Sequence, residues 1–216
     1  MDERIFHLIN ERWTHPALDL FMPIVSSAPI WSPIFVLIGI ALLIFGGFRG
    51  RAFVFCTLLA LGFSNLFVGP LKHTIARSRP KQVQPVRMVE LQPAKPAFIT
   101  VFKKPRVRFS TEADRSRAGV SFPSGHVNNN TVIALCCTLF YRRWGKLYWI
   151  ITVAVAYSRI YLGAHWPSDV FATFFLAAGE TLLVLALCEL IWKKLVSRRL
   201  PELAAHHPTL LSNLRS

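Results

Sequence analysis

The residues best suited to chemistry lie in a polar stretch, residues 158–169, that interrupts an otherwise apolar run. Pro167 suits the first position of a helix, where its missing N–H needs no partner, and His165 would then lie just before that helix. Asp169 would fall in the first turn, where its carboxylate could accept a hydrogen bond from one imidazole nitrogen. The other nitrogen would then be free to act as a base or nucleophile. Taken alone, the pair also fits a surface histidine beside a helix-capping aspartate.

Two further stretches carry residues of the same kind. Residues 72–80 read KHTIARSRP, and residues 123–126 read PSGH. The second stretch looks like a helix start, because Pro123 and Ser124 precede a long uncharged run.

The three stretches together contain the donors that a phosphate ester needs. Lys72, Arg79 and Arg159 supply permanent positive charge, and arginine can contact phosphate oxygens with two N–H groups at once. The Ser124 hydroxyl and the backbone N–H of Gly125 could donate further hydrogen bonds at the helix start. Each arginine alone would also fit the edge of a membrane with its charge in water, but their joint spacing favours an anion site.

The stretches resemble the three-part signature of the type 2 phosphatidic acid phosphatase (PAP2) superfamily. That signature reads lysine-x6-arginine-proline, then proline-serine-glycine-histidine, then serine-arginine-x5-histidine-x3-aspartate. Every specified position matches in order, and the resemblance covers residues 72–169. Chance agreement at this many positions is not a serious competitor.

The resemblance implies roles for three residues. The histidine at the position of His165 attacks phosphorus to give a phosphohistidine, and the aspartate at the position of Asp169 orients it. The histidine at the position of His126 protonates the leaving oxygen and then activates water. No carboxylate cluster typical of a magnesium or zinc site is evident, so we expect a metal-independent reaction without a cofactor.

Composition indicates a membrane protein. The chain has 216 residues, of which 53% are hydrophobic and 17% charged, and we interpret residues 1–216 as one membrane-embedded domain. The formal net charge of +14 comes from basic residues at the ends of apolar runs and in one long loop. This arrangement suits anionic headgroups, and no nucleic-acid-binding pattern is present. The four cysteines lie inside apolar segments and are expected to be free.

The apolar runs predict an all-α, polytopic membrane helix bundle with about five transmembrane helices. Residues 1–27 are expected to form one or two short helices in the membrane interface, with no removable signal peptide. The loop 81–122 should lie outside the membrane with little regular structure, and the tail from Glu202 should be frayed. Glu180, at mid-span, should face the bundle interior. The predicted spans are 30–48, 52–71, 127–141, 147–164 and 170–192.

Five spans place all three signature stretches on one side of the membrane. The opposite side carries most of the basic residues next to span ends, so the positive-inside rule makes that side cytoplasmic. We therefore expect a multi-pass cell (inner) membrane protein whose site faces the periplasm or exterior. The basic residues on the cytoplasmic side are Arg49, Arg51, Arg142, Arg143, Lys146, Lys193, Lys194, Arg198 and Arg199.

A site at the membrane surface implies a membrane lipid phosphate as substrate. The resemblance allows undecaprenyl diphosphate, phosphatidylglycerophosphate, phosphatidate or lipid A phosphates, and the sequence does not choose among them. Three alternatives stay open: a lipid phosphotransferase that uses the same phosphohistidine, a vanadium haloperoxidase, and a non-catalytic lipid-phosphate-binding protein. The apolar spans argue against the haloperoxidases, which are soluble, and two histidines with an aspartate argue against pure binding.

Overall fold

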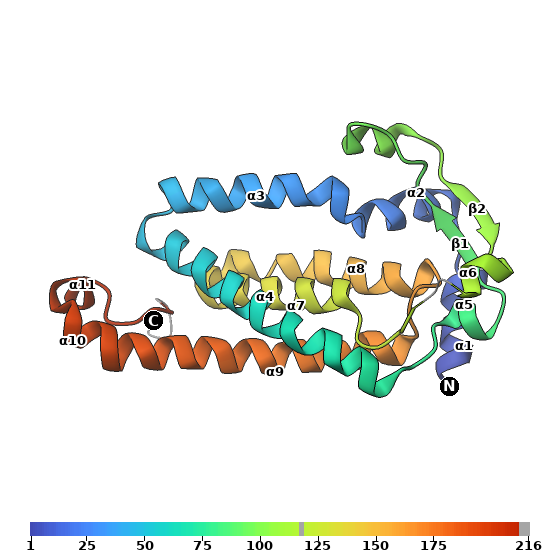
Figure 1. Cartoon of the computed structure of the whole chain (residues 1–216). Coiled ribbons are helices and arrows are strands. Elements are labelled where there is room, and N and C mark those ends of the chain that lie inside the picture. Colours follow the sequence, from blue (N-terminus) through green and yellow to red (C-terminus); the bar gives the residue numbers. More distant parts are fainter. Residues whose placement is uncertain (117–118, 212–216) are drawn as a thin grey trace.

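The computed structural model describes residues 1–116 and 119–211 as a helical bundle with a small cap at one end (Figure 1). In chain order its elements are α1 (Asp2–His7), η1 (Leu8–Arg12), α2 (Pro16–Val25), α3 (Ala28–Phe45), α4 (Gly47–Ile75), α5 (Pro80–Val83), β1 (Arg87–Glu90), η2 (Ala97–Phe102), β2 (Arg106–Phe109), α6 (Glu112–Ser116), α7 (Gly125–Gly145), α8 (Tyr148–Tyr161), α9 (Pro167–Ile191), η3 (Trp192–Val196), α10 (Ser197–Arg199) and α11 (Pro201–His206).

Helix α7 is the centre of the bundle. It packs against α4, α8 and α9, and α4 also packs against α9 and α3. The buried cluster between these helices contains several small side chains, among them Ala60, Cys136 and Ala177, which let helix backbones approach closely. All four cysteines are free, as predicted.

Three described helices are long and apolar enough to cross a membrane: α3, α4 and α9 with its continuation to Lys194. Helix α3 has no buried residue, which is typical of a helix that faces lipid. The chain is therefore a helical membrane protein, as the sequence predicted. Helices α7 and α8 coincide with the other two predicted spans but do not meet the same length and apolarity limits, so the count of five stays a prediction.

The loop 81–122 has more regular structure than the sequence analysis expected, and that expectation was wrong. Strands β1 and β2 pair antiparallel, with Arg87 opposite Phe109 and Glu90 opposite Arg106. The side chain of Arg108 donates to Glu90 at 2.7 Å and to Asp114 at 2.5 Å. These ion pairs tie β2 both to its partner strand and to α6, so long-range contacts order a segment whose prolines suggested an irregular loop.

The N-terminal segment forms short helices, as predicted, and packs on the same end of the bundle as the cap. Phe6 and Asn10 are fully buried. The Asn10 side-chain amide donates to the carbonyl of Tyr161 at 2.7 Å and to that of Arg87 at 2.9 Å. One amide therefore joins the N-terminal segment to β1 and to the last residue of α8.

The C-terminal tail is not frayed up to Leu211, contrary to expectation. The Glu189 carboxylate accepts hydrogen bonds from the backbone N–H groups of Leu210 and Leu211, and the Trp192 indole donates to the His207 carbonyl. The buried Glu189 carboxylate, the Trp192 indole and the buried side chains of Leu210 and Leu211 therefore hold the tail against the bundle. Figure 1 shows this tail at one end of the bundle and the cap, with the N-terminus, at the other.

Candidate functional site

The site is built around the turn between α8 and α9. Helix α8 ends at Tyr161, and Pro167 occupies the first turn of α9, as the sequence predicted. Gly163 adopts φ +69°, and a Cβ there would lie 2.9 Å from a methyl carbon of Val86. Only glycine suits this combination of positive φ and close approach, which brings the turn against the chain before β1. The His165 N–H donates to the Arg159 carbonyl at 3.2 Å and holds His165 beside the end of α8.

Backbone hydrogen bonds join the three signature stretches. Ser78 pairs with Val120 in an isolated bridge, and the Ser121 N–H donates to the Arg77 carbonyl at 2.8 Å. The Trp166 indole donates to the Ser78 carbonyl at 2.9 Å. Chain segments far apart in sequence are thereby fixed side by side at one end of the bundle.

Two more hydrogen bonds complete this framework. The Arg79 guanidinium Nε donates to the Val120 carbonyl at 3.1 Å. The Ser124 N–H donates to the Thr173 hydroxyl at 3.0 Å, which fixes the start of α7 against α9. Helix α7 begins at Gly125 with Ser124 as its N-cap residue, so the first backbone N–H groups of the helix lack intrahelical partners.

His165 lies in a dry, positively charged environment. The residue is 3% exposed. Burial, and after it the nearby charges of Arg159 and Arg79, hold the pKa of His165 well below its usual value near 6.5. The imidazole is therefore neutral at neutral pH, which is the form that has a free lone pair.

The remaining predicted residues gather around the same point. His126 also interacts electrostatically with His165, and it lies within reach of the charges of Arg159, Arg79 and Lys72. The charge of Asp169 acts on Arg79. The structure thus brings the predicted histidines, cations and aspartate together in one place.

Three polar atoms of this site are buried without a hydrogen-bond partner among the described residues: Ser124 Oγ, Arg159 Nε and His165 Nδ1. An unpaired buried polar atom costs about 1–3 kcal/mol. Two of these atoms are donors and all three belong to the signature stretches. An anion with several oxygens would supply the partners that the two donors lack.

Asp169 does not make the expected hydrogen bond to His165, since Nδ1 is one of these unpartnered atoms and the Asp169 carboxylate has other partners. It accepts from Arg77 at 2.6 Å, from the Ser121 hydroxyl at 2.5 Å and from the Trp166 backbone N–H at 3.2 Å. The difference arises because the fully buried carboxylate is already saturated by stronger or nearer donors. Asp169 therefore binds the backbone of Trp166, the residue that follows His165, and does not bind the His165 imidazole.

Sequence reasoning left Arg77 unassigned and did not consider Asp2. Arg77 bridges Asp2 and Asp169, each at 2.6 Å, and Ser168 donates to Asp2 through both its N–H and its hydroxyl. Partial burial raises the pKa of Asp2, but these hydrogen bonds outweigh it and lower the pKa below its usual value. The signal available in the sequence was Arg77, which lies two residues before the signature arginine. Nothing local points to Asp2, which lies 167 residues before Asp169.

Glu180 contacts the interior of the bundle, as predicted. Its carboxylate lies 2.5 Å from the hydroxyl of Ser64 on α4, which also lies 2.8 Å from the amide oxygen of Asn128 on α7. The three residues connect α4, α7 and α9 below the site.

Within the described ranges, no group of three or more His, Cys, Asp or Glu side chains is arranged to hold a metal ion. The donor set around His165 consists instead of cations, hydroxyls and imidazoles, which suits an anionic ligand.

Comparison with known proteins gives the same family as the sequence signature. Over 50 residues the chain is 44% identical to the putative undecaprenyl-diphosphatase YbjG of Escherichia coli, covering 23% of this chain and 25% of that protein. Over 145 residues it is 29% identical to the lipid A 1-phosphatase of Rhizobium johnstonii, covering 66% of this chain and 50% of that protein. The chain thus spans half or less of the length of these relatives.

The crystal structure of Aquifex aeolicus LpxE shares the fold, with a TM-score of 0.60 at 23% identity. The match covers 86% of this chain and 94% of that chain. The model of the PAP2 superfamily matches residues 53–193, which include all three signature stretches and the helices that carry them. The chain belongs to the PAP2 superfamily.

Proposed function

We propose that the chain is an integral membrane lipid phosphatase that hydrolyses a lipid phosphate or diphosphate through a phosphohistidine intermediate. The observation that carries this proposal is the neutral, buried His165 beside Arg79 and Arg159, with unpartnered polar atoms on Ser124 and Arg159. A phosphate ester matches this set because its transition state spreads negative charge over several oxygens. A positively charged site that only bound lipid would not need a desolvated nucleophile.

In the first step, a nitrogen of His165 attacks phosphorus while the bond from phosphorus to the lipid oxygen breaks. His126, which the anionic phosphate bound beside it favours in the protonated form, gives its proton to that oxygen, and the lipid alcohol, or lipid monophosphate, leaves. In the second step, His126 takes a proton from water, the water oxygen attacks phosphorus, and the P–N bond breaks to release phosphate. Lys72, Arg79 and Arg159, with Ser124 and the N–H of Gly125, would hold the phosphoryl oxygens.

Asp169 acts in this scheme as a positioning residue. Its carboxylate accepts from the Trp166 N–H, and Trp166 directly follows the nucleophile, so Asp169 fixes the backbone that presents His165. Loss of Asp169 would leave this backbone and the Arg77 side chain without their shared partner.

We further propose that α7 and α8 complete five spans, which places the site at the outer surface of the inner membrane. This proposal is supported by the position of the cap and the signature stretches, which lie opposite the turn between α3 and α4, the turn between α7 and α8, and the tail (Figure 1). The membrane-embedded lipid substrate could then reach the site from the outer leaflet. Undecaprenyl diphosphate and lipid A phosphates are supported by the relatives, and phosphatidylglycerophosphate and phosphatidate stay within the same class.

The test is phosphate release by the purified full chain from a panel of these lipid phosphates and diphosphates, with and without EDTA. We expect release from at least one lipid, with no loss in EDTA. A phosphorylated acceptor without free phosphate would identify a phosphotransferase. Lipid binding without any phosphate transfer would refute the enzymatic proposal, and magnesium-restored activity after EDTA would refute the mechanism.

A further inference from the structure

The segment between β1 and β2 exposes aromatic and basic side chains side by side, away from the proposed catalytic site. Phe98 and Phe102 of η2 are both exposed, and Phe102 is 85% exposed. Lys103 and Lys104 follow directly and are also exposed. Exposed rings next to cations are typical of surfaces that contact lipid, where the rings meet acyl chains and the cations meet headgroups.

The position of η2 supports such a contact. The segment packs against α3, the apolar helix without any buried residue. Figure 1 shows the green segment after β1 folded back beside the start of α3, although both strands lie in the cap. The exposed rings therefore lie next to a helix surface that is itself suited to lipid.

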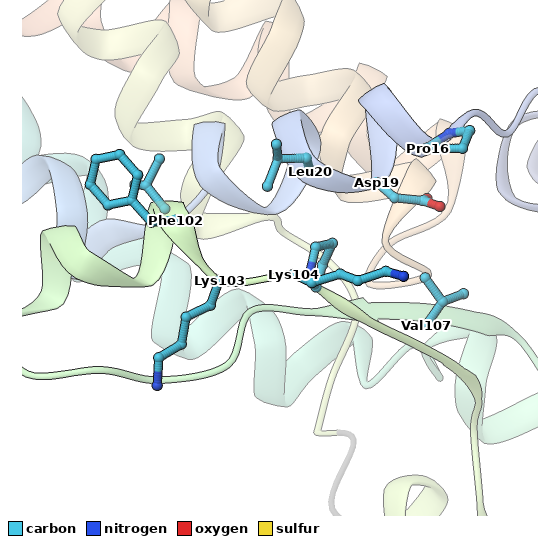
Figure 2. Close-up of a pocket in the computed structure, with 9 residues that line it drawn as sticks. Pro16, Asp19, Leu20, Phe102, Lys103, Lys104 and Val107 are labelled. Atoms are coloured by element: carbon cyan, nitrogen blue, oxygen red, sulfur yellow. The ribbon is translucent and has the colours of Figure 1, made fainter.

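A cavity of about 530 Å³ opens between α2 and residues 101–107. Its apolar lining includes Leu20, Phe102 and Val107, and the two lysines complete it. In Figure 2, Lys104 extends along the cavity toward Val107, whereas the Lys103 amine points away from α2. The cavity thus offers an apolar wall with one ammonium group inside and another at its edge.

The charge of this cavity is positive. Neither Lys103 nor Lys104 forms an ion pair with a described residue, whereas Arg108 of the same hairpin is bound by two carboxylates. Asp19 also lines the cavity, but its carboxylate is already bound by Arg87 at 2.6 Å and by the Tyr161 hydroxyl at 2.6 Å. An anion in the cavity would therefore meet the free Lys104 ammonium group, with the Lys103 ammonium group at the cavity edge, and a carboxylate that is already paired.

We propose that this cavity binds an anionic glycerophospholipid of the surrounding bilayer. The lipid phosphate contacts Lys104 inside the cavity, Lys103 adds positive charge at the cavity edge, and the acyl chains lie against Phe102, Leu20 and the exposed face of α3. The bound lipid would hold the hairpin against the outer leaflet, beside the route by which a membrane substrate reaches the site. The inference concerns a bilayer lipid and does not depend on the proposed hydrolysis.

Photo-crosslinking of the full chain tests the proposal. Phe102 is replaced by p-benzoylphenylalanine, and the protein is placed in nanodiscs with equal amounts of phosphatidylglycerol and phosphatidylcholine. After irradiation, mass spectrometry of the protein gives the attached lipids. We expect lipid adducts, with phosphatidylglycerol favoured roughly fivefold or more, since each basic residue near a membrane surface strengthens binding of anionic lipid.

Two charge variants complete the design. Lys103→Gln with Lys104→Gln should bring the adduct ratio close to one. The matched control, Arg143→Gln with Lys146→Gln, removes two exposed cations from the opposite end of the bundle and should leave the ratio unchanged. A monodisperse elution profile for each variant shows that the fold is intact.

Three results would overturn the proposal. Absence of lipid adducts would mean that Phe102 lies in water, and equal labelling of the two lipids in the parent protein would mean that the lysines select no anion. Loss of phosphatidylglycerol adducts when a few molar equivalents of undecaprenyl diphosphate are added before irradiation would assign the cavity to that class of lipid instead. Because no turnover is measured, failure of the phosphatase proposal would leave these readings unaffected.

Discussion

Two arginines near the turn between α8 and α9 differ in whether carboxylates pair with them. On one side, Arg77 is bound by Asp2 and by the buried Asp169, each at 2.6 Å. On the other side, Arg159 is partly buried, its Nε lacks a partner among the described residues, and its guanidinium has only a long hydrogen bond, 3.4 Å, to the Ser26 hydroxyl. Both arginines lie at the same end of the bundle. Their location in the molecule therefore does not explain why only Arg77 has carboxylate partners among the described residues.

This difference separates residues that hold the site from residues that meet the ligand. A saturated ion pair stabilises the fold and leaves little capacity for a substrate. An unpaired buried cation destabilises the fold, and it is expected where a ligand supplies the missing charge. Substitutions on the two sides should therefore affect stability and activity in different proportions.

The largest effect on activity should come from His165→Ala. Removal of the proposed nucleophile should lower phosphate release by roughly 10⁴-fold or more. The protein should remain folded, because His165 Nδ1 has no partner to lose. Phosphate release and thermal unfolding in detergent measure the two expectations, and near-normal turnover in this variant would refute the proposed mechanism.

Arg159→Gln should separate activity from stability. Loss of a charge that would contact the phosphoryl oxygens should lower kcat/KM by roughly 10²–10³-fold. The Tm should stay the same or rise, because the change removes a partly buried charge that has no carboxylate partner among the described residues. A marked fall in Tm would show that Arg159 stabilises the fold as Arg77 does, and the distinction between the two arginines would be wrong.

Arg77→Gln should show the reverse pattern. The buried Asp169 carboxylate would lose its only described ion-pair partner, so the protein should lose about 2 kcal/mol of stability, with roughly a tenfold fall in kcat and little change in KM. Asp2→Asn is the matched variant, because Asp2 is partly exposed and pairs with the same guanidinium. Its effect should stay below about 1 kcal/mol. Equal losses in the two variants would show that Asp169 is not the partner that matters.

The smallest effect should be a shift in the pH profile. The low pKa of His165 keeps the imidazole neutral below pH 6.5, so the acid limb of kcat/KM should lie below that value. Arg159 is one cause of the lowered pKa, and Arg159→Gln should therefore move the acid limb of its residual activity to higher pH. An acid limb that stays in place in this variant would mean that another group controls it.

The sequence allowed prediction of the helices and of the signature residues, because both leave local signals. Uncharged runs marked α3, α4 and α9, and Pro167 marked the start of α9. The sequence also predicted that the three signature stretches lie at one end of the bundle, because an even number of predicted spans separates each stretch from the next.

The partners of Asp169 could not be predicted in the same way. Its donors come from Arg77, from Ser121 and from the backbone of Trp166, so the choice depends on how distant segments pack. The β1–β2 hairpin was missed for a similar reason. Its order rests on Arg108, whose two carboxylate partners have no spacing that identifies them in the sequence.

The contact of Ser64 with Asn128 and Glu180 has a mechanical consequence for the site. Apolar helices in lipid have little to fix how far each is turned about its own axis, whereas a polar contact between them does. Lys72 lies about two turns beyond Ser64 on α4, and His126 lies two residues before Asn128 on α7. A few hydrogen bonds close to the site therefore fix the rotation of two helices about their axes, and with it the direction in which Lys72 and His126 point.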